Sequence, residues 1–172
     1  LVGSEMCIRD SFIAGDKDGN VFFDSDQSLI RYDIQTQKFS CLRKSNVYTV
    51  ASIKGTIWVG IADSILTWNP DKNDFDFVTR LENRNQRATC LLEDSGGRYW
   101  IGTTDGLFKM NDDKSLTCMI MGEDIYDLYE DSKYNLWISI RMNGMYKRDV
   151  HGNFTRYRYD PSNPNNCLLY TS

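Results

Sequence analysis

Carboxylates, an amide and a glycine cluster in the segment Asp16-Lys-Asp-Gly-Asn20, and oxygen-rich loops of this kind can hold calcium. An EF-hand loop places glycine at position six and glutamate at position twelve. Counted from Asp16, Gly19 stands at position four and Gln27 at position twelve. Asp, Asn and Gly also favour tight turns, because they accept positive φ or cap the backbone with their side chains. The segment therefore indicates a hairpin turn, and we expect no metal there.

Histidine and cysteine are too sparse to predict a catalytic or metal centre. The one histidine, His151, lies in the turn-like sequence Asp149-Val-His-Gly-Asn153, and no sequence feature pairs it with a nucleophile. The cysteines show neither CxxC nor metal-ligand spacing: Cys7, Cys41, Cys90, Cys118 and Cys167. We expect them to fill small apolar sites, with a disulfide among Cys41, Cys90 and Cys118 as the alternative. We predict no catalytic residue, no metal and no cofactor.

An aromatic residue recurs along the chain after a turn and before a small apolar hairpin. The positions are Phe22, Trp58, Trp100 and Trp137, spaced by 36, 42 and 37 residues. A period near forty residues with short strands is typical of repeat folds. Because each aromatic residue occupies the same middle strand of its repeat, we expect packing between repeats rather than sugar stacking. Trp68 breaks this register and is the predicted exposed aromatic residue.

Each repeat divides into four short strands separated by turns rich in Asp, Asn and Gly. In the third repeat the predicted strands are 88–93, 99–103, 107–110 and 115–120. No segment shows the apolar period and caps of a helix. Four antiparallel strands in each forty-residue unit predict an all-β fold, a β-propeller fragment of about four blades. A solenoid of β-arches is the alternative.

The bulk composition excludes several functional classes. The 172 residues are 41% hydrophobic and 13% aromatic, so the chain can fold around a sizeable core. The net charge is −4 and no basic stripe occurs, which argues against nucleic acid and anionic membrane surfaces as partners. No apolar run approaches the roughly 20 residues that span a bilayer.

Several segments resemble the two-component regulator propeller repeat. They are 93–108 (EDSGGRYWIGTTDGLF), 130–139 with 143–146, and the link-like sequence 154–164. The second repeat departs from the pattern with Ala62-Asp-Ser64 in place of Thr-Asp-Gly, and the first has Phe22 in place of tryptophan. The resemblance covers roughly residues 12–166, and it implies blades over 12–45, 46–83, 84–122 and 123–160. Residues 1–11 and 167–172 resemble translated sequencing adapters, and we expect them to be artefacts.

In the family that the chain resembles, such propellers form the periplasmic sensor of Bacteroidetes-type hybrid histidine kinases that sense glycans. The resemblance implies a non-catalytic, ligand-sensing ectodomain fragment that signals to a kinase absent from this chain. It implies an oligosaccharide or other small ligand, a homodimer in the full-length protein, and no membrane contact by this segment. The alternatives are a propeller scaffold for protein contacts, or a propeller lyase or lactonase with a central histidine or carboxylate cluster around a metal.

The meander geometry narrows the candidate ligand-binding residues. The entry to the first strand and the turn between the second and third strands lie at the same end of a blade. Loops at such an end commonly bind ligands, because rigid strands hold them. The candidates at this end are Tyr48, Arg87, Arg141 and Asn143, and Trp68 is a further candidate as the exposed aromatic residue. Arg87, Arg141 and Asn143 could hydrogen-bond a sugar acid or hydroxyl groups, and ordinary solvated loop positions are the alternative.

Overall fold

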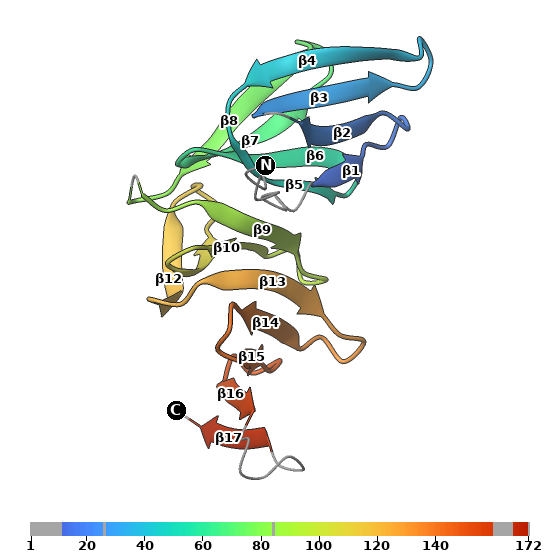
Figure 1. The fold of residues 1–172 in the computed structure, drawn as a ribbon. Coiled ribbons are helices and arrows are strands. Elements are labelled where there is room, and N and C mark those ends of the chain that lie inside the picture. The colour runs from blue at the N-terminus through green and yellow to red at the C-terminus, as the bar shows by residue number, and fades with distance from the viewer. Residues whose placement is uncertain (1–11, 26, 84, 160–166, 172) are drawn as a thin grey trace, which may run out of the picture.

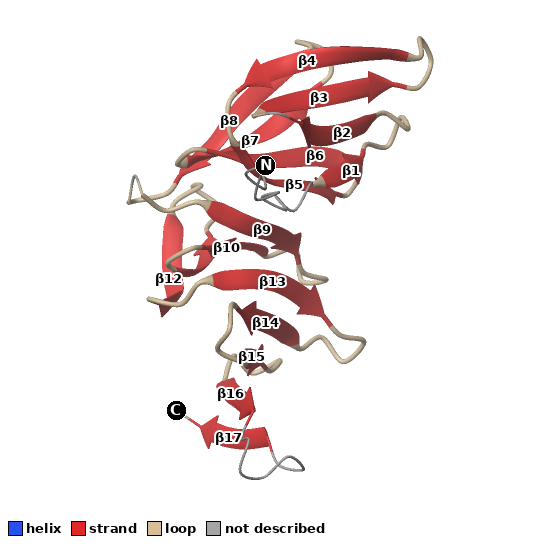
Figure 2. Cartoon of the chain, viewed as in Figure 1, coloured by secondary structure: helices blue, strands red, loops and turns tan. Residues whose placement is uncertain are grey.

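The computed structural model describes residues 12–25, 27–83, 85–159 and 167–171. Within these ranges the chain forms β-strands joined by turns, and no helix occurs (Figure 2). The strands make four antiparallel sheets that succeed one another in chain order (Figure 1). Each sheet is a meander, in which every strand pairs with the one before it. The predicted all-β propeller architecture is confirmed, and each sheet is one blade.

The strand bounds follow the repeats. The first blade holds β1 (Ile13–Gly15), β2 (Val21–Ser25), β3 (Ser28–Asp33) and β4 (Lys38–Lys44). The second holds β5 (Val47–Ile53), β6 (Thr56–Ile61), β7 (Ser64–Asn69) and β8 (Asp74–Arg80). The third holds β9 (Ala88–Glu93), β10 (Tyr99–Thr103), β11 (Gly106–Met110) and β12 (Leu116–Met121). The fourth holds β13 (Ile125–Glu130), β14 (Leu136–Ile140), β15 (Met145–Arg148), β16 (Phe154–Tyr159) and β17 (Cys167–Thr171).

The fourth blade differs from the expected four strands, because β17 pairs antiparallel with β16 as a fifth. This strand falls within 167–172, the segment predicted to be an artefact. Residues 1–11, the other such segment, lie outside the described residues. Both assignments stay predictions.

Aspartate side chains build the turns of the meanders. In the turn Asp131–Asn135, the aspartate Oδ1 accepts the backbone N–H of Asn135 at 2.9 Å, and the Asn135 amide donates back to Oδ2 at 2.9 Å. The same arrangement recurs in the turns Asp16–Asn20 and Asp149–Asn153. The hairpin turn predicted for 16–20 is therefore confirmed, and the carboxylate of Asp16 is engaged in holding that turn.

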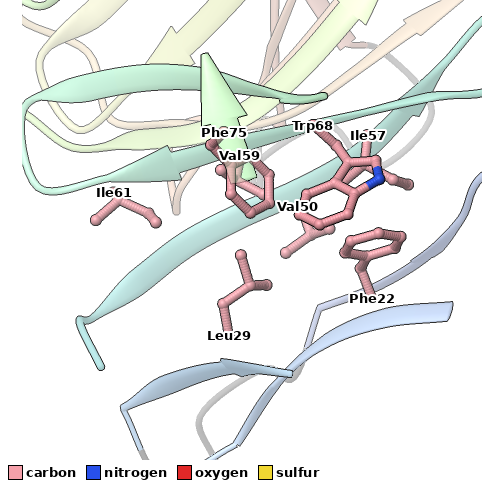
Figure 3. Close-up of a cluster of buried hydrophobic side chains, with 8 residues drawn as sticks. All are labelled: Phe22, Leu29, Val50, Ile57, Val59, Ile61, Trp68 and Phe75. Carbon is pink, nitrogen blue, oxygen red and sulfur yellow. The ribbon is translucent and has the colours of Figure 1, made fainter. Parts of the chain in front are cut away.

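Aromatic residues of the second strands pack against the following blade. Phe22 is fully buried and meets Trp68 of the second blade edge-on, with ring centroids 5.2 Å apart (Figure 3). Trp58 stacks on Tyr99 of the third blade at 5.0 Å. Burying aromatic side chains of this size contributes a large share of the stability of a core. The predicted role in packing between repeats is confirmed for both positions.

In the third and fourth blades, the burial of the aromatic residue on the second strand depends on whether a further blade follows. Trp100 is 1% exposed, and the guanidinium of Arg148 in the fourth blade lies 5.3 Å from its ring centroid. Trp137 is only half-buried and contacts Tyr157 of its own blade at 5.6 Å. Among the described residues no further blade covers Trp137. The aromatic residue is thus buried where a following blade lies against it.

The prediction that Trp68 is exposed is wrong. Its side chain is 6% exposed and lies in edge contacts with Phe22 and Phe75, and the Arg31 guanidinium sits 5.4 Å from its ring centroid (Figure 3). The second blade is covered on both faces, by the first blade and by the third. A residue out of register with Trp58 therefore faces the other buried side and not the solvent.

The cysteines divide between core and surface. Cys90 in β9 is buried, as expected of a small apolar residue. Cys41 in β4 and Cys118 in β12 are exposed, so the core role predicted for them is wrong, because both lie in the outermost strand of a blade. All three thiols are free, and the alternative of a disulfide among them is not realised. Cys7 lies outside the described residues.

Among the described residues, no other blade covers one face of the first blade. We call this the open face, and it is lined by Ile13, Val21, Phe23, Tyr32 and Phe39. By the register of strand pairing, these residues are equivalent to five residues of the second blade. Those five residues are buried against the first blade: Val50, Ile57, Val59, Trp68 and Phe75. Ile13 is 71% and Phe39 is 69% exposed. The open face thus has the composition of an interface between blades.

Two glycines on second strands allow the first strand of the next blade to approach closely. A Cβ on Gly60 in β6 would lie 2.9 Å from the Cβ of Ala88 in β9. A Cβ on Gly102 in β10 would lie 2.7 Å from Cγ2 of Ile125 in β13. Real side chains almost never come so close, so a larger residue would displace the next blade or the paired first strand of its own blade, where Thr49 and Cys90 lie equally near or nearer.

Candidate ligand site along the inner strands

The first strands of the blades form an inner row, in which β1 contacts β5, β5 contacts β9 and β9 contacts β13 (Figure 1). A cavity of about 660 Å³ opens along this row. Its walls combine the entries to the first strands with the turns between second and third strands, as the meander geometry predicts. The lining residues are Phe12, Asp24, Gln27, Asn46, Val47, Tyr48, Thr49, Val50, Ala51, Arg87, Thr89, Cys90, Leu91, Thr104, Tyr126, Asp127 and Arg141.

A one-residue bulge near the start of three inner strands shapes this cavity. The pairing of β5 with β6 skips Tyr48, that of β9 with β10 skips Thr89, and that of β13 with β14 skips Tyr126. A bulge bends the strand and re-aims the side chain of the unpaired residue. All three unpaired residues line the cavity. The second, third and fourth blades therefore each deliver one polar or aromatic side chain to the same space.

Two arginines stack on the two bulged tyrosines. The Arg87 guanidinium carbon lies 4.9 Å from the Tyr48 ring centroid, and that of Arg141 lies 4.9 Å from the Tyr126 ring centroid. Contacts of this length are cation–π interactions, and they hold the planar guanidinium in a fixed orientation. Tyr126 is 47% exposed, so this pair remains accessible from the solvent.

The two arginines differ in their remaining partners. Arg141 donates through Nε to Asp124 Oδ2 at 3.0 Å, which balances its charge. Arg87 donates through Nη1 to the backbone carbonyl of Asn85 at 3.2 Å. Among the described residues no carboxylate forms an ion pair with Arg87. Its remaining N–H groups can therefore donate to a ligand.

The base of the cavity is structural. Thr89 Oγ1 donates to the Ile125 carbonyl at 2.6 Å and ties β9 to β13. Burial raises the pKa of the Cys90 thiol to about 12. The thiolate is the nucleophilic form, so Cys90 stays protonated and unreactive at neutral pH.

Three of the five predicted ligand-binding residues meet in this cavity: Tyr48, Arg87 and Arg141. Asn143 does not line it, and its Nδ2 donates to Glu123 Oε2 at 3.0 Å. Trp68 lies in the core, as described above. Tyr126 was missed, although its signal was available, because it occupies in the fourth blade the place that Tyr48 occupies in the second.

The described ranges hold neither a cluster of metal ligands nor a helix that could span a membrane. No group of three or more His, Cys, Asp and Glu side chains within them is placed to hold a metal ion. His151 lies in the exposed turn between β15 and β16, where its backbone N–H donates to Asp149 Oδ1 at 2.9 Å. No helix in the described part of the chain is long and apolar enough to cross a membrane.

Comparison with protein families gives one match. Residues 84–105 match the family model described as "Two component regulator propeller". This segment covers β9, its following turn and β10, and it contains the Trp100 phrase, so the predicted resemblance is confirmed there. Comparison with curated proteins gives no match.

Solved structures share the fold. One is the extracellular domain assigned to a hybrid two component system of B. thetaiotaomicron, with a TM-score of 0.76 and 20% identity over 91% of this chain. A second such domain from the same organism has a TM-score of 0.68 and 20% identity over 86%. This chain spans 23% and 21% of those two chains. Virginiamycin B lyase from Staphylococcus aureus has a TM-score of 0.68 and 16% identity over 88%, and this chain spans 55% of it.

Proposed function

We propose that this chain is part of an extracytoplasmic sensor propeller of a two-component signalling protein. In this proposal it is non-catalytic, binds an oligosaccharide in the cavity along the inner strands, and signals to a kinase outside this segment. The segment would lie in the periplasm and function in a homodimer. The match of residues 84–105 to the propeller repeat and the fold shared with extracellular domains of hybrid two component systems support the signalling context.

The single observation that carries ligand binding is the convergence of the bulged residues on one cavity. Tyr48 and Tyr126 offer aromatic rings, and Arg87 and Arg141 offer donors beside them. A few fixed polar groups among apolar walls, in a volume of several hundred Å³, are typical of small-molecule sites. Aromatic rings beside hydrogen-bond donors suit a sugar, which has apolar ring faces and hydroxyl edges.

The position of the cavity suggests how binding could be transmitted. Its walls come from several blades, so a bound ligand would contact strands of neighbouring blades at the same time. A ligand shifts an equilibrium only by its difference in affinity for the two states. A ligand that bridges blades would favour one relative arrangement of the two ectodomains in a dimer.

Two other functions are less well supported. A scaffold for protein contacts would need no convergent aromatic and cationic groups in a cavity. A lyase is suggested only by the shared fold with virginiamycin B lyase, and fold does not imply function. The one histidine lies in the turn between β15 and β16, at the opposite end of its blade from the turn that carries Arg141.

A ligand screen tests the proposal. The purified chain would be melted in the presence of neutral and acidic oligosaccharides, and hits would be titrated by calorimetry. The variant Tyr48→Ala should lose binding at least tenfold, whereas Tyr134→Ala, which removes an exposed tyrosine from the turn between β13 and β14, should not. No stabilisation by any oligosaccharide, or equal binding by Tyr48→Ala, would contradict the proposal.

A further inference from the structure

We infer that the cavity recognises a sugar bearing a carboxylate, and that Arg87 binds the carboxylate. This inference rests on the proposed function and narrows its ligand class. The two Arg–Tyr pairs have the same distance between guanidinium carbon and ring centroid. They differ in whether a carboxylate balances the charge of the arginine.

The repeat makes the difference between the two pairs visible. Arg87 and Asp124 occupy equivalent positions, each one residue before its inner strand. Thr104 and Arg141 are likewise equivalent. The backbone N–H of Thr104 donates to the carbonyl of Arg87 at 3.0 Å, and that of Arg141 donates to the carbonyl of Asp124 at 2.8 Å. The fourth blade thus carries an internal pair of Arg141 and Asp124. Within the described ranges the third blade carries the cation without such a partner, and a carboxylate of the ligand would supply one.

The geometry of Arg87 suits this role. Stacking on Tyr48 fixes the plane of the guanidinium, and only Nη1 donates to a backbone carbonyl. An arginine presents five N–H donors in a planar fork, which matches a carboxylate with two parallel hydrogen bonds. Because the side chain is already oriented, less rotamer entropy is lost on binding.

The rest of the lining favours a polyhydroxylated anion over a simple one. Asp24 and Asp127 also line the cavity, and each uses one oxygen, Oδ1, to accept a backbone N–H, at 2.6 and 2.8 Å. Their Oδ2 atoms can accept hydrogen bonds from hydroxyl groups. Asn46 adds an exposed amide at the entry to β5. A uronic acid unit places its carboxylate at one end and its hydroxyl groups along the other edges, which fits this mixture.

The matched ligands are acidic trisaccharides and the same trisaccharides after reduction of the carboxyl group to a primary alcohol. Galacturonate, glucuronate and mannuronate series would be titrated against the full chain by calorimetry. At least one acidic ligand should bind roughly tenfold or more tightly than its reduced form, which is the scale of a hydrogen bond to a charged group. Its affinity should also fall with added salt.

Variants at Arg87 and at a control lysine distinguish the role of Arg87 from general effects of positive charge. Arg87→Gln should lower the affinity for the acidic ligand by roughly tenfold to a hundredfold and leave the reduced ligand unchanged. Arg87→Lys keeps the charge without the planar fork, so its affinity for the acidic ligand should lie between those of the wild type and Arg87→Gln. Lys72→Gln removes a positive charge from the turn between β7 and β8, at the other end of its blade, and should change nothing. A melting curve for each variant confirms that it is folded.

The outcomes distinguish this inference from the proposed function. If acidic and reduced ligands bind equally and Tyr48→Ala loses binding, recognition of a carboxylate is overturned, whereas binding of a sugar in the cavity stands. Acidic binding that Arg87→Gln does not weaken would overturn the role of Arg87. Absence of binding by every sugar would overturn both proposals.

Discussion

The indole Nε1–H of Trp100 donates a 2.8 Å hydrogen bond to Oδ2 of Asp94, six residues earlier in the chain. Both side chains are almost completely buried. Asp94→Ala would leave the indole N–H without a partner, and an unsatisfied buried donor costs about 1–3 kcal/mol. We therefore expect Asp94→Ala to lower the free energy of unfolding by that amount, as measured by urea denaturation.

The control for this prediction is Asp113→Ala. Asp113 is exposed and bonds only within its turn, to Ser115. Its loss should change the free energy of unfolding by about 0.5 kcal/mol or less. Equal destabilisation by the two variants would show that the turn, and not the buried indole bond, is responsible.

Acid should destabilise the fold through its turn aspartates. The backbone N–H of Thr36 and the Arg31 guanidinium lower the pKa of Asp33 from 3.8 to about 2. Hydrogen bonds from the Trp137 indole and the Asn135 amide hold the pKa of Asp131 well below its usual range. A carboxyl group with a lowered pKa in the folded state stabilises the protein above its unfolded pKa, and this contribution is lost as pH falls.

For Asp33 the loss should occupy the window from about pH 4 down to pH 2. The measurement is the melting temperature across this range. Asp33→Asn should reduce this dependence and leave the part that Asp131 contributes, and Asp71→Asn, in the exposed turn between β7 and β8, serves as the control substitution. A melting temperature that Asp33→Asn leaves equally sensitive to acid would contradict the assignment.

Gly106 should tolerate no side chain. Its φ is +149°, and a Cβ there would overlap the carbonyl oxygen of Ile120 in the paired strand β12. Strain and overlap together predict that Gly106→Ala costs about 2–3 kcal/mol. Gly122 also has a positive φ, +75°, but its Cβ would meet nothing within 4 Å. Gly122→Ala should therefore cost only about 1 kcal/mol, and a thermal melt that ranks the two in the opposite order would refute the argument.

The open face of the first blade should cause the chain to associate. An apolar surface that matches the buried face of the second blade is a binding surface for another blade. We expect sedimentation to show species heavier than the 19.9 kDa monomer. Phe39→Ser should shift the distribution toward monomer, and Phe77→Ser, at another exposed phenylalanine on β8, should not. A monodisperse wild-type monomer would contradict this prediction.

The sequence predicted the strands well, because turn residues and apolar alternation are local signals. The strands predicted for the third repeat agree with β9 to β12 within one residue at each end. Trp68 was misplaced because the pattern of one strand does not reveal that both faces of its blade are covered. The tail strand β17 had no signal in the repeat.

The candidate site was only half predictable for a related reason. The meander places Tyr48, Arg87 and Arg141 at one end, and the cavity confirms that placement. Tyr126 could have been predicted, because it occupies in the fourth blade the place of Tyr48 in the second, and a bulge at each position brings the side chain to the cavity. Asn143 lies at the predicted end, but Glu123 holds its amide, and Glu123 in turn pairs with Arg156 of β16. Such pairing across strands depends on the folded register.

The glycines of β6 and β10 have a consequence for the curvature of the molecule. Gly60 and Gly102 bring neighbouring blades into backbone proximity at their inner edges, while Trp58 and Trp100 hold the same blades apart farther out. Consecutive blades are therefore wedge-shaped sectors whose angle depends on the size of one small residue. The equivalent position, two residues after the aromatic one, is Asp24 in the first blade and Ser139 in the fourth. We expect the residue at this position to influence the angle between neighbouring blades.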